Sequence, residues 1–162
     1  MDRTRLRKRA TAEAQTLCAM SMKMTAKNII KEEVILQLNR QGIIFEILND
    51  EELNKIYEKW IEKFIGNKKA PILENYKWHI FSYNKKKLEG IKATEEYNNQ
   101  YPSDVYIFNE KLDFGIKCKV SENLPMIKFD EHFDDIYISH YNMKWTYVIT
   151  HESPFIGPYF SK

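Results

Sequence analysis

The sequence contains few of the residues on which well-known catalytic and cofactor-binding motifs depend. Among 162 residues there are five glycines and two cysteines, Cys18 and Cys118. No glycine-rich phosphate loop, Gly-x-Ser-x-Gly elbow or Cys-x-x-Cys pair occurs, and neither cysteine has a partner at metal-ligand spacing. The sequence therefore predicts no cofactor and no metal site. It also predicts reduced thiols in an intracellular compartment.

Long apolar segments are also absent. No run approaches the roughly 20 apolar residues that span a bilayer. Residues 17–24, behind the basic N-terminus, are too short and too polar for the core of a signal peptide. We therefore expect a cytoplasmic protein with no membrane partner.

Positive charge is concentrated at the N-terminus. Residues 1–24 hold six basic and two acidic residues, whereas the remaining residues hold 19 basic and 21 acidic ones. A folded domain that binds nucleic acid needs a basic surface to contact phosphates. Since the body of this chain is slightly acidic, we expect no nucleic-acid partner.

Composition changes near residue 25, which divides the chain into a basic leader and a domain. Residues 1–24 contain four of the five arginines but no Ile, Asn, Tyr or Phe. A translation start placed too far upstream, with Met22 or Met24 as the true start, is the favoured explanation. A flexible, disordered basic arm and a mitochondrial-type presequence stay open. Residues 25–162 are predicted to form a single domain.

Two segments have the apolar spacing of amphipathic helices. The first has apolar residues at every fourth position and ends near Gly42, and its stripe consists of Ile30, Val34 and Leu38. The second covers residues 53–65 and ends at Gly66. Asn49 and Glu52 precede it at the spacing of a capping box. A weaker helix is predicted over residues 88–98.

Six segments are predicted as strands because they are short, rich in β-branched or aromatic residues and bounded by turn residues. They are residues 43–48, 76–83, 104–108, 114–120, 136–139 and 144–150. Short polar links around Glu110 and around Tyr141 and Asn142 predict two hairpins. The expected fold is α+β: a single domain with a mixed, mostly antiparallel sheet of five or six strands, and two or three helices packed on one face.

Two segments carry a resemblance to a known family. They are Trp78–Tyr83 and a C-terminal stretch that contains Trp145-Thr146-Tyr147-Val148, Thr150-His151-Glu152 and Gly157-Pro158-Tyr159-Phe160. Both are similar to markers of an uncharacterised bacterial domain-of-unknown-function family, found mostly in Bacillus-like Firmicutes. The resemblance extends from about residue 36 to the C-terminus and implies no known activity.

The C-terminal stretch is also where a site is predicted. His151 is the candidate general base, because histidine titrates near neutral pH, and Glu152 and His79 are its candidate assistants. Position 155 is Phe, so this His-Glu pair does not start a zinc-protease motif. The candidate binding residues are Trp78, Ser82, Trp145, Tyr147, Thr150 and Tyr159. The favoured interpretation is a structural one without a site. In it, these aromatics close the core and the polar residues satisfy backbone groups at the strand end.

A second polar cluster lies just before the last predicted hairpin. It consists of Asp130, Glu131, His132, Asp134 and Asp135. The cluster is rich in cation ligands, but its spacing does not match an EF-hand. A solvated acidic loop is therefore favoured over a metal site.

The sequence favours a small cytosolic binding module over an enzyme. The absence of nucleophile, phosphate and metal motifs points to a non-catalytic protein- or ligand-binding protein, for example a bacterial accessory or immunity-type protein. Its partner is expected to be an unidentified protein, and the many tyrosines suit an interface. The chain is expected to be a monomer, or a homodimer that pairs an exposed edge strand. The alternative function is a small hydrolase-like enzyme that uses His151 with Glu152 and His79.

Overall fold

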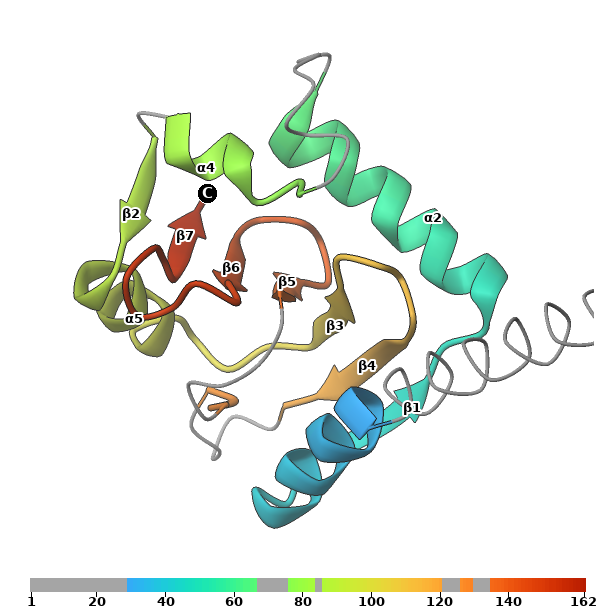
Figure 1. Ribbon diagram of the computed structural model, residues 1–162. Helices are drawn as coiled ribbons and strands as arrows, with labels where there is room; N and C mark the ends of the chain where they lie inside the picture. Colours follow the sequence, from blue (N-terminus) through green and yellow to red (C-terminus); the bar gives the residue numbers. More distant parts are fainter. Residues whose placement is uncertain (1–28, 67–75, 84–85, 121–125, 130–134) are drawn as a thin grey trace, which may run out of the picture.

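The computed structural model of the protein describes residues 29–66, 76–83, 86–120, 126–129 and 135–162 (Figure 1). The basic leader, with Cys18, lies outside the described residues, and so does most of the acidic cluster, residues 130–134.

The described residues form one antiparallel sheet of seven strands in the order β1-β4-β3-β5-β6-β7-β2. The strands are β1 (Ile44–Ile47), β2 (Lys87–Glu89), β3 (Val105–Asn109), β4 (Gly115–Lys119), β5 (Ile136–His140), β6 (Thr146–Ile149) and β7 (Tyr159–Ser161). Both predicted hairpins are confirmed, because β3 pairs with β4 and β5 pairs with β6. The α+β class is confirmed as well, with more strands than predicted and every pairing antiparallel.

The two amphipathic helices form where their apolar spacing indicated. Residues 29–40 are helical, and the other helices are α2 (Asp50–Trp60), which continues as the π-helical turn η1 (Ile61–Ile65), α4 (His79–Tyr83) and α5 (Ile91–Asn98). The capping box of α2 is confirmed: the Glu52 amide donates to Asn49 Oδ1 at 3.0 Å, and the Asn49 amide donates to Glu52 Oε2 at 3.1 Å. These bonds satisfy two backbone N–H groups at the start of the helix that have no acceptor within the helix.

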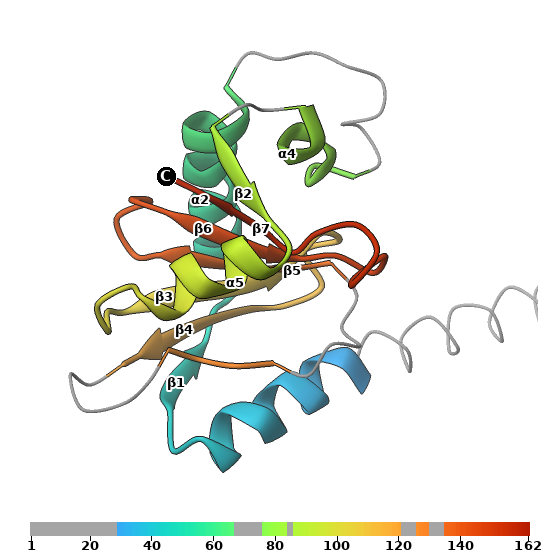
Figure 2. The same cartoon turned by 90° about the vertical axis from the view of Figure 1, so that its left-hand side faces the viewer.

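The helices cover both faces of the sheet, which corrects the prediction that they share one face (Figures 1 and 2). The helix of residues 29–40 and α5 bury Val34, Leu38, Ala93 and Tyr97 against one face. Helix α2, η1 and α4 cover the other face. The reason is that the central strands are buried on both sides, as in β5, where all five residues are buried. One layer of helices cannot remove both faces from water.

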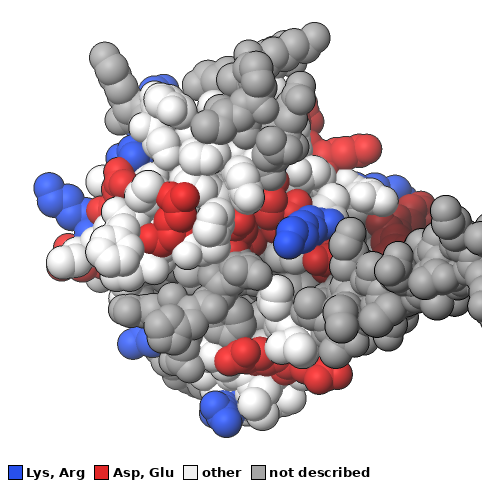
Figure 3. Space-filling view, in the orientation of Figure 1, with Lys and Arg blue, Asp and Glu red and all other residues white. Residues whose placement is uncertain are grey.

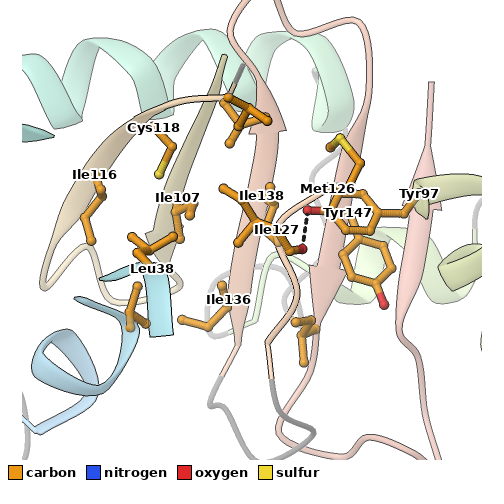
Figure 4. Close-up of a cluster of buried hydrophobic side chains, with 14 of the residues drawn as sticks. Leu38, Tyr97, Ile107, Ile116, Cys118, Met126, Ile127, Ile136, Ile138 and Tyr147 are labelled. Atoms are coloured by element: carbon orange, nitrogen blue, oxygen red, sulfur yellow. Dashed lines mark hydrogen bonds between the residues drawn. The ribbon is translucent and has the colours of Figure 1, made fainter. Parts of the chain in front are cut away.

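Each face has its own aromatic core. Figure 4 shows the first, in which the Tyr97 hydroxyl donates to the carbonyl of Ile127 at 2.7 Å. The second is centred on Trp60, which is 0 % exposed and donates through Nε1 to Thr146 Oγ1 at 3.0 Å. Tyr137 packs edge-on against Trp60 with 4.8 Å between ring centroids. Helix α2 is therefore fixed to the sheet by both packing and a buried hydrogen bond.

Two secondary-structure predictions were wrong. The segment of residues 76–83 is a turn followed by α4, not a strand. Its buried residues include Trp78 and Phe81, which are three apart, and the Phe81 amide donates to the Trp78 carbonyl at 2.9 Å. The helix predicted from Leu88 begins instead at Ile91, because Leu88 pairs with Phe160 in the β2–β7 ladder. In both places tertiary packing overrides a weak local pattern.

Gly115 sits where β4 approaches α2, and replacing it by alanine is expected to destabilise the fold. A Cβ at this position lies 2.7 Å from Cδ1 of Leu53, which is buried at the start of α2. Overpacking of this kind costs about 1–3 kcal/mol. Urea unfolding of Gly115→Ala measures the loss. Lys119→Ala serves as the control, because Lys119 is an exposed residue of the same strand, and equal stability of the two variants contradicts the close approach.

Candidate functional site

The ends of three adjacent strands bring the polar residues of the site together. The sheet register aligns Asn109 of β3 with Ile136 of β5, and Ile136 with Ile149 of β6. The residues just beyond this row are therefore Glu110, which follows β3, and Asp135, which precedes β5. The Glu110 amide donates to the Asp135 carbonyl at 3.1 Å, which extends the ladder by one step. His151 lies two residues past the end of β6.

Asp135 holds His151 in place. Its side chain is buried, and its Oδ1 accepts a hydrogen bond from the His151 amide at 3.1 Å and lies 3.0 Å from the His151 Nδ1 atom. The other carboxylate oxygen is 3.1 Å from the same nitrogen. An Nδ1–H donated to this carboxylate fixes the tautomer and leaves Nε2 as the proton acceptor. The pair has the geometry of an oriented histidine base.

Glu110 is a half-buried carboxylate beside this pair. Its Oε2 accepts from the amide of Lys77 at 2.9 Å and from the hydroxyl of Tyr137. Burial raises the pKa of the Glu110 carboxyl, and the two hydrogen bonds and the positive charge of Lys77 oppose that rise only in part. Burial and the neighbouring Glu110 also raise the pKa of the Tyr137 phenol, which therefore stays protonated and donates. Among the described residues, no hydrogen bond reaches Glu110 Oε1.

A pocket of about 190 Å³ opens between these residues. The side chains that line it, within the described ranges, are those of Ile30, Tyr76, Asn109, Glu110, Lys111, Asp135 and His151. The Tyr76 ring lies over one side, 5.4 Å from the His151 ring centroid. The loops after β3 and β6 lie on the face turned to the viewer in Figure 3, where acidic side chains gather near the centre beside a basic one. The pocket thus combines two carboxylates, a histidine, an aromatic ring and one lysine.

The three predicted catalytic residues are only partly brought together. Adjacent residues of a strand point to opposite faces of the sheet. Here the chain turns directly after β6, so the neighbours His151 and Glu152 approach each other, with 3.8 Å between His151 Nε2 and Glu152 Oε1. His79 stacks on Trp78 with 3.8 Å between ring centroids, and both Trp78 and Tyr76 contact the His151 ring. The link from His79 to His151 therefore runs through aromatic rings. The roles of all three residues stay predictions.

The six predicted binding residues lie mostly in the interior. Trp78, Trp145, Tyr147, Thr150 and Tyr159 are all buried, and Ser82 is half-buried. The Ser82 hydroxyl lies 2.9 Å from the Tyr159 hydroxyl, and the Thr150 hydroxyl donates to the carbonyl of Ile156. Their contacts give them packing and loop-closing roles in the fold, and ligand contact by these residues stays a prediction. Trp78 is a special case, because its indole Nε1 is buried without a hydrogen-bond partner among the described residues.

The comparison with known families covers most of the chain. The sequence matches the family DUF4275, described as a domain of unknown function, over residues 20–160. The chain belongs to the DUF4275 family. The predicted resemblance to a domain-of-unknown-function family is confirmed to this extent. No curated protein and no solved structure matches the chain.

Sequence reasoning misses two members of this DUF4275 pocket. The pattern along the chain assigns Glu110 only to a hairpin link and Asp135 only to the acidic cluster. The available signal is their position in the sequence: Glu110 lies two residues after the predicted strand 104–108, and Asp135 directly precedes the predicted strand 136–139. The pairing of β3 with β5, which makes them neighbours, joins segments some 30 residues apart in sequence.

The described residues offer no metal site and no reactive thiol. No group of three or more His, Cys, Asp or Glu side chains in these ranges is arranged to hold a metal ion. Burial raises the pKa of the Cys118 thiol to about 12, so this core cysteine stays protonated. No helix within the described ranges has the length and apolar character needed to cross a membrane.

Proposed function

We propose that the chain is a non-catalytic binding module of the bacterial cytoplasm, of the accessory or immunity type, that holds a positively charged hydrogen-bond donor in the Glu110 pocket. The donor belongs to a ligand or to a partner protein. One observation carries the proposal: Glu110 is a half-buried carboxylate whose pKa is raised by burial, and its Oε1 accepts no hydrogen bond from the described residues although the side chain lines an open pocket. Groups whose pKa is perturbed by burial and by charged neighbours concentrate at functional sites.

The physical argument concerns the free-energy cost of burying the Glu110 carboxylate and the interactions that offset it. Removing a carboxylate from water costs free energy unless hydrogen bonds and opposite charge replace the water. Inside the fold, Glu110 receives two hydrogen bonds on one oxygen, and the positive charge of Lys77 also acts on the carboxylate. An ammonium or guanidinium group at the other oxygen adds opposite charge there, and the Tyr76 ring beside it suits a cation. Lys111 also lines the pocket and opposes a cation, so we expect modest affinity.

The test is an NMR titration of the labelled full chain with methylguanidinium. We expect shift changes at the amides of Lys77, Glu110, Asp135 and His151. Methylurea, which has a similar shape without the charge, serves as the matched ligand control. Glu110→Gln is expected to weaken binding about tenfold, which corresponds to about 1.4 kcal/mol. Equal responses to both ligands, or unchanged binding by the variant, contradict the proposal.

A second function, a small hydrolase-like enzyme, is favoured by the hydrogen bond between Asp135 and His151 Nδ1. In this function, His151 Nε2 takes a proton from an attacking water and Asp135 positions the ring. The described residues that line the pocket include no serine, threonine or cysteine nucleophile, so the water itself attacks. An ester-hydrolysis screen tests it: turnover that His151→Gln abolishes and Asp135→Asn lowers supports the enzyme, and turnover that survives His151→Gln excludes it.

A further inference from the structure

A second, larger pocket is lined by other residues of the 150–158 loop. It has a volume of about 510 Å³. The N-terminal half of α5 forms one wall through Ile91, Thr94 and Glu95, and the loop forms another through Pro154 and Pro158. Tyr147 lines it from β6, with its hydroxyl 3.0 Å from Thr94 Oγ1. We name it the α5 pocket. Its apolar lining and size suit an aromatic side chain.

The loop beside the α5 pocket presents an exposed aromatic residue. Phe155 is 93 % exposed, directly after Pro154 of the pocket wall. The loop is held by main-chain hydrogen bonds, in which the amides of Phe155 and Ile156 donate to the Glu152 carbonyl at 2.9 and 3.1 Å. Ile91, on the opposite wall, is 79 % exposed. Exposed apolar groups that gather around a pocket mark an interaction surface.

The exposed ring of Phe155 lies beside the α5 pocket in sequence but does not line it. Phe155 points into solvent and leaves the pocket of its own chain open. When the same surface carries both a projecting group and a matching hollow, a two-fold axis between them lets each copy fill the other. Such an interface is closed, since both projecting groups and both hollows are used.

The charges on α5 fit the same arrangement. Lys92 and Glu95 are exposed, and neither side chain forms an ion pair within the described part of the chain. They lie on neighbouring positions of the helix surface, beside the pocket. If a two-fold axis pairs two α5 helices in opposite directions and crosses them between Ala93 and Thr94, Lys92 of each copy lies opposite Glu95 of the other. Opposite charges at these positions support the interface, and like charges oppose it.

We propose that this surface is the interface of a homodimer in which Phe155 of each copy occupies the α5 pocket of its partner. The occupant is a second copy of this chain, because the chain itself supplies both the aromatic side chain and the complementary charge pair. The interface is independent of the Glu110 pocket, and its failure leaves the proposed ligand binding intact.

Sedimentation of the full chain over micromolar to millimolar concentrations tests the proposal. We expect a monomer–dimer equilibrium whose dissociation constant rises at least tenfold in Phe155→Ser. Tyr101→Ser is the matched control, because Tyr101 is 91 % exposed and does not line the pocket, and it is expected to dimerise like the wild type. Circular dichroism checks that each variant is folded.

The charge pair gives a second test that a simple loss of folding cannot imitate. Glu95→Lys is expected to weaken the dimer, and the exchange Lys92→Glu with Glu95→Lys is expected to restore it. A wild-type chain that stays monomeric at the highest concentration overturns the proposal. A dimer that Phe155→Ser leaves unchanged also overturns it. The same holds if a different protein binds at Phe155 while the chain alone stays monomeric.

Discussion

Replacement of Trp60 by alanine is expected to destabilise the protein by about 3–5 kcal/mol, as for other buried aromatic residues. Trp60 is completely buried and packs edge-on against Phe81, Phe108 and Tyr137, which come from α4, β3 and β5. The substitution leaves a cavity where three elements meet. It also removes the donor that satisfies Thr146 Oγ1. Since small domains have only about 5–15 kcal/mol of total stability, much of the chain should unfold at moderate urea concentration.

The conservative variant Trp60→Phe separates the two contributions. It keeps an aromatic ring but removes the indole N–H, so its loss should be clearly smaller than that of alanine. Equilibrium urea unfolding, followed by far-ultraviolet circular dichroism, measures both variants. A loss below about 1 kcal/mol for Trp60→Ala contradicts a core centred on this residue.

The second prediction concerns the pH dependence of stability. Burial raises the pKa of Glu110 in the folded protein above its value in the unfolded chain. The folded state therefore holds this proton more tightly. The stability that the protonated carboxyl contributes is fully present below the unfolded pKa and is lost as pH rises through the folded pKa. We expect Glu110→Gln, which cannot ionise, to lose less stability than the wild type between acid and neutral pH.

Urea unfolding of both proteins at a series of pH values gives the comparison. The matched control is Glu62→Gln, since Glu62 is exposed on η1. Its curve should run parallel to that of the wild type. Parallel curves for Glu110→Gln as well mean that the Glu110 carboxyl is not perturbed by folding, and the argument for its pocket then fails.

Local sequence patterns predict the parts of this fold whose contacts are local. The capping box of Asn49 and Glu52 needs only neighbouring residues, and a short polar link is enough to pair β3 with β4. The alternation along β6 also predicts its two faces, since Tyr147 and Val148 enter opposite cores. These elements form as expected because their stabilising partners lie within a few residues.

The errors have a common physical origin in contacts between distant segments. Residues 76–83 have strand-like composition, but Phe81 packs on Trp60 and Tyr159, which lie far away in sequence. Of the predicted catalytic residues, His151 lines the Glu110 pocket. The two carboxylates of that pocket escape prediction because only the β3–β5 pairing makes Glu110 and Asp135 neighbours. No periodicity within a single segment contains that information.

The most direct test of the proposed function is a carbon-13 NMR titration of the Glu110 carboxyl, with and without methylguanidinium. We predict a pKa above that of the exposed glutamates in the free protein. We also predict that the cation lowers this pKa when it binds, because it favours the charged carboxylate. An ordinary pKa in the free protein, or a pKa that methylguanidinium does not change, contradicts the proposal that Glu110 receives a positively charged partner.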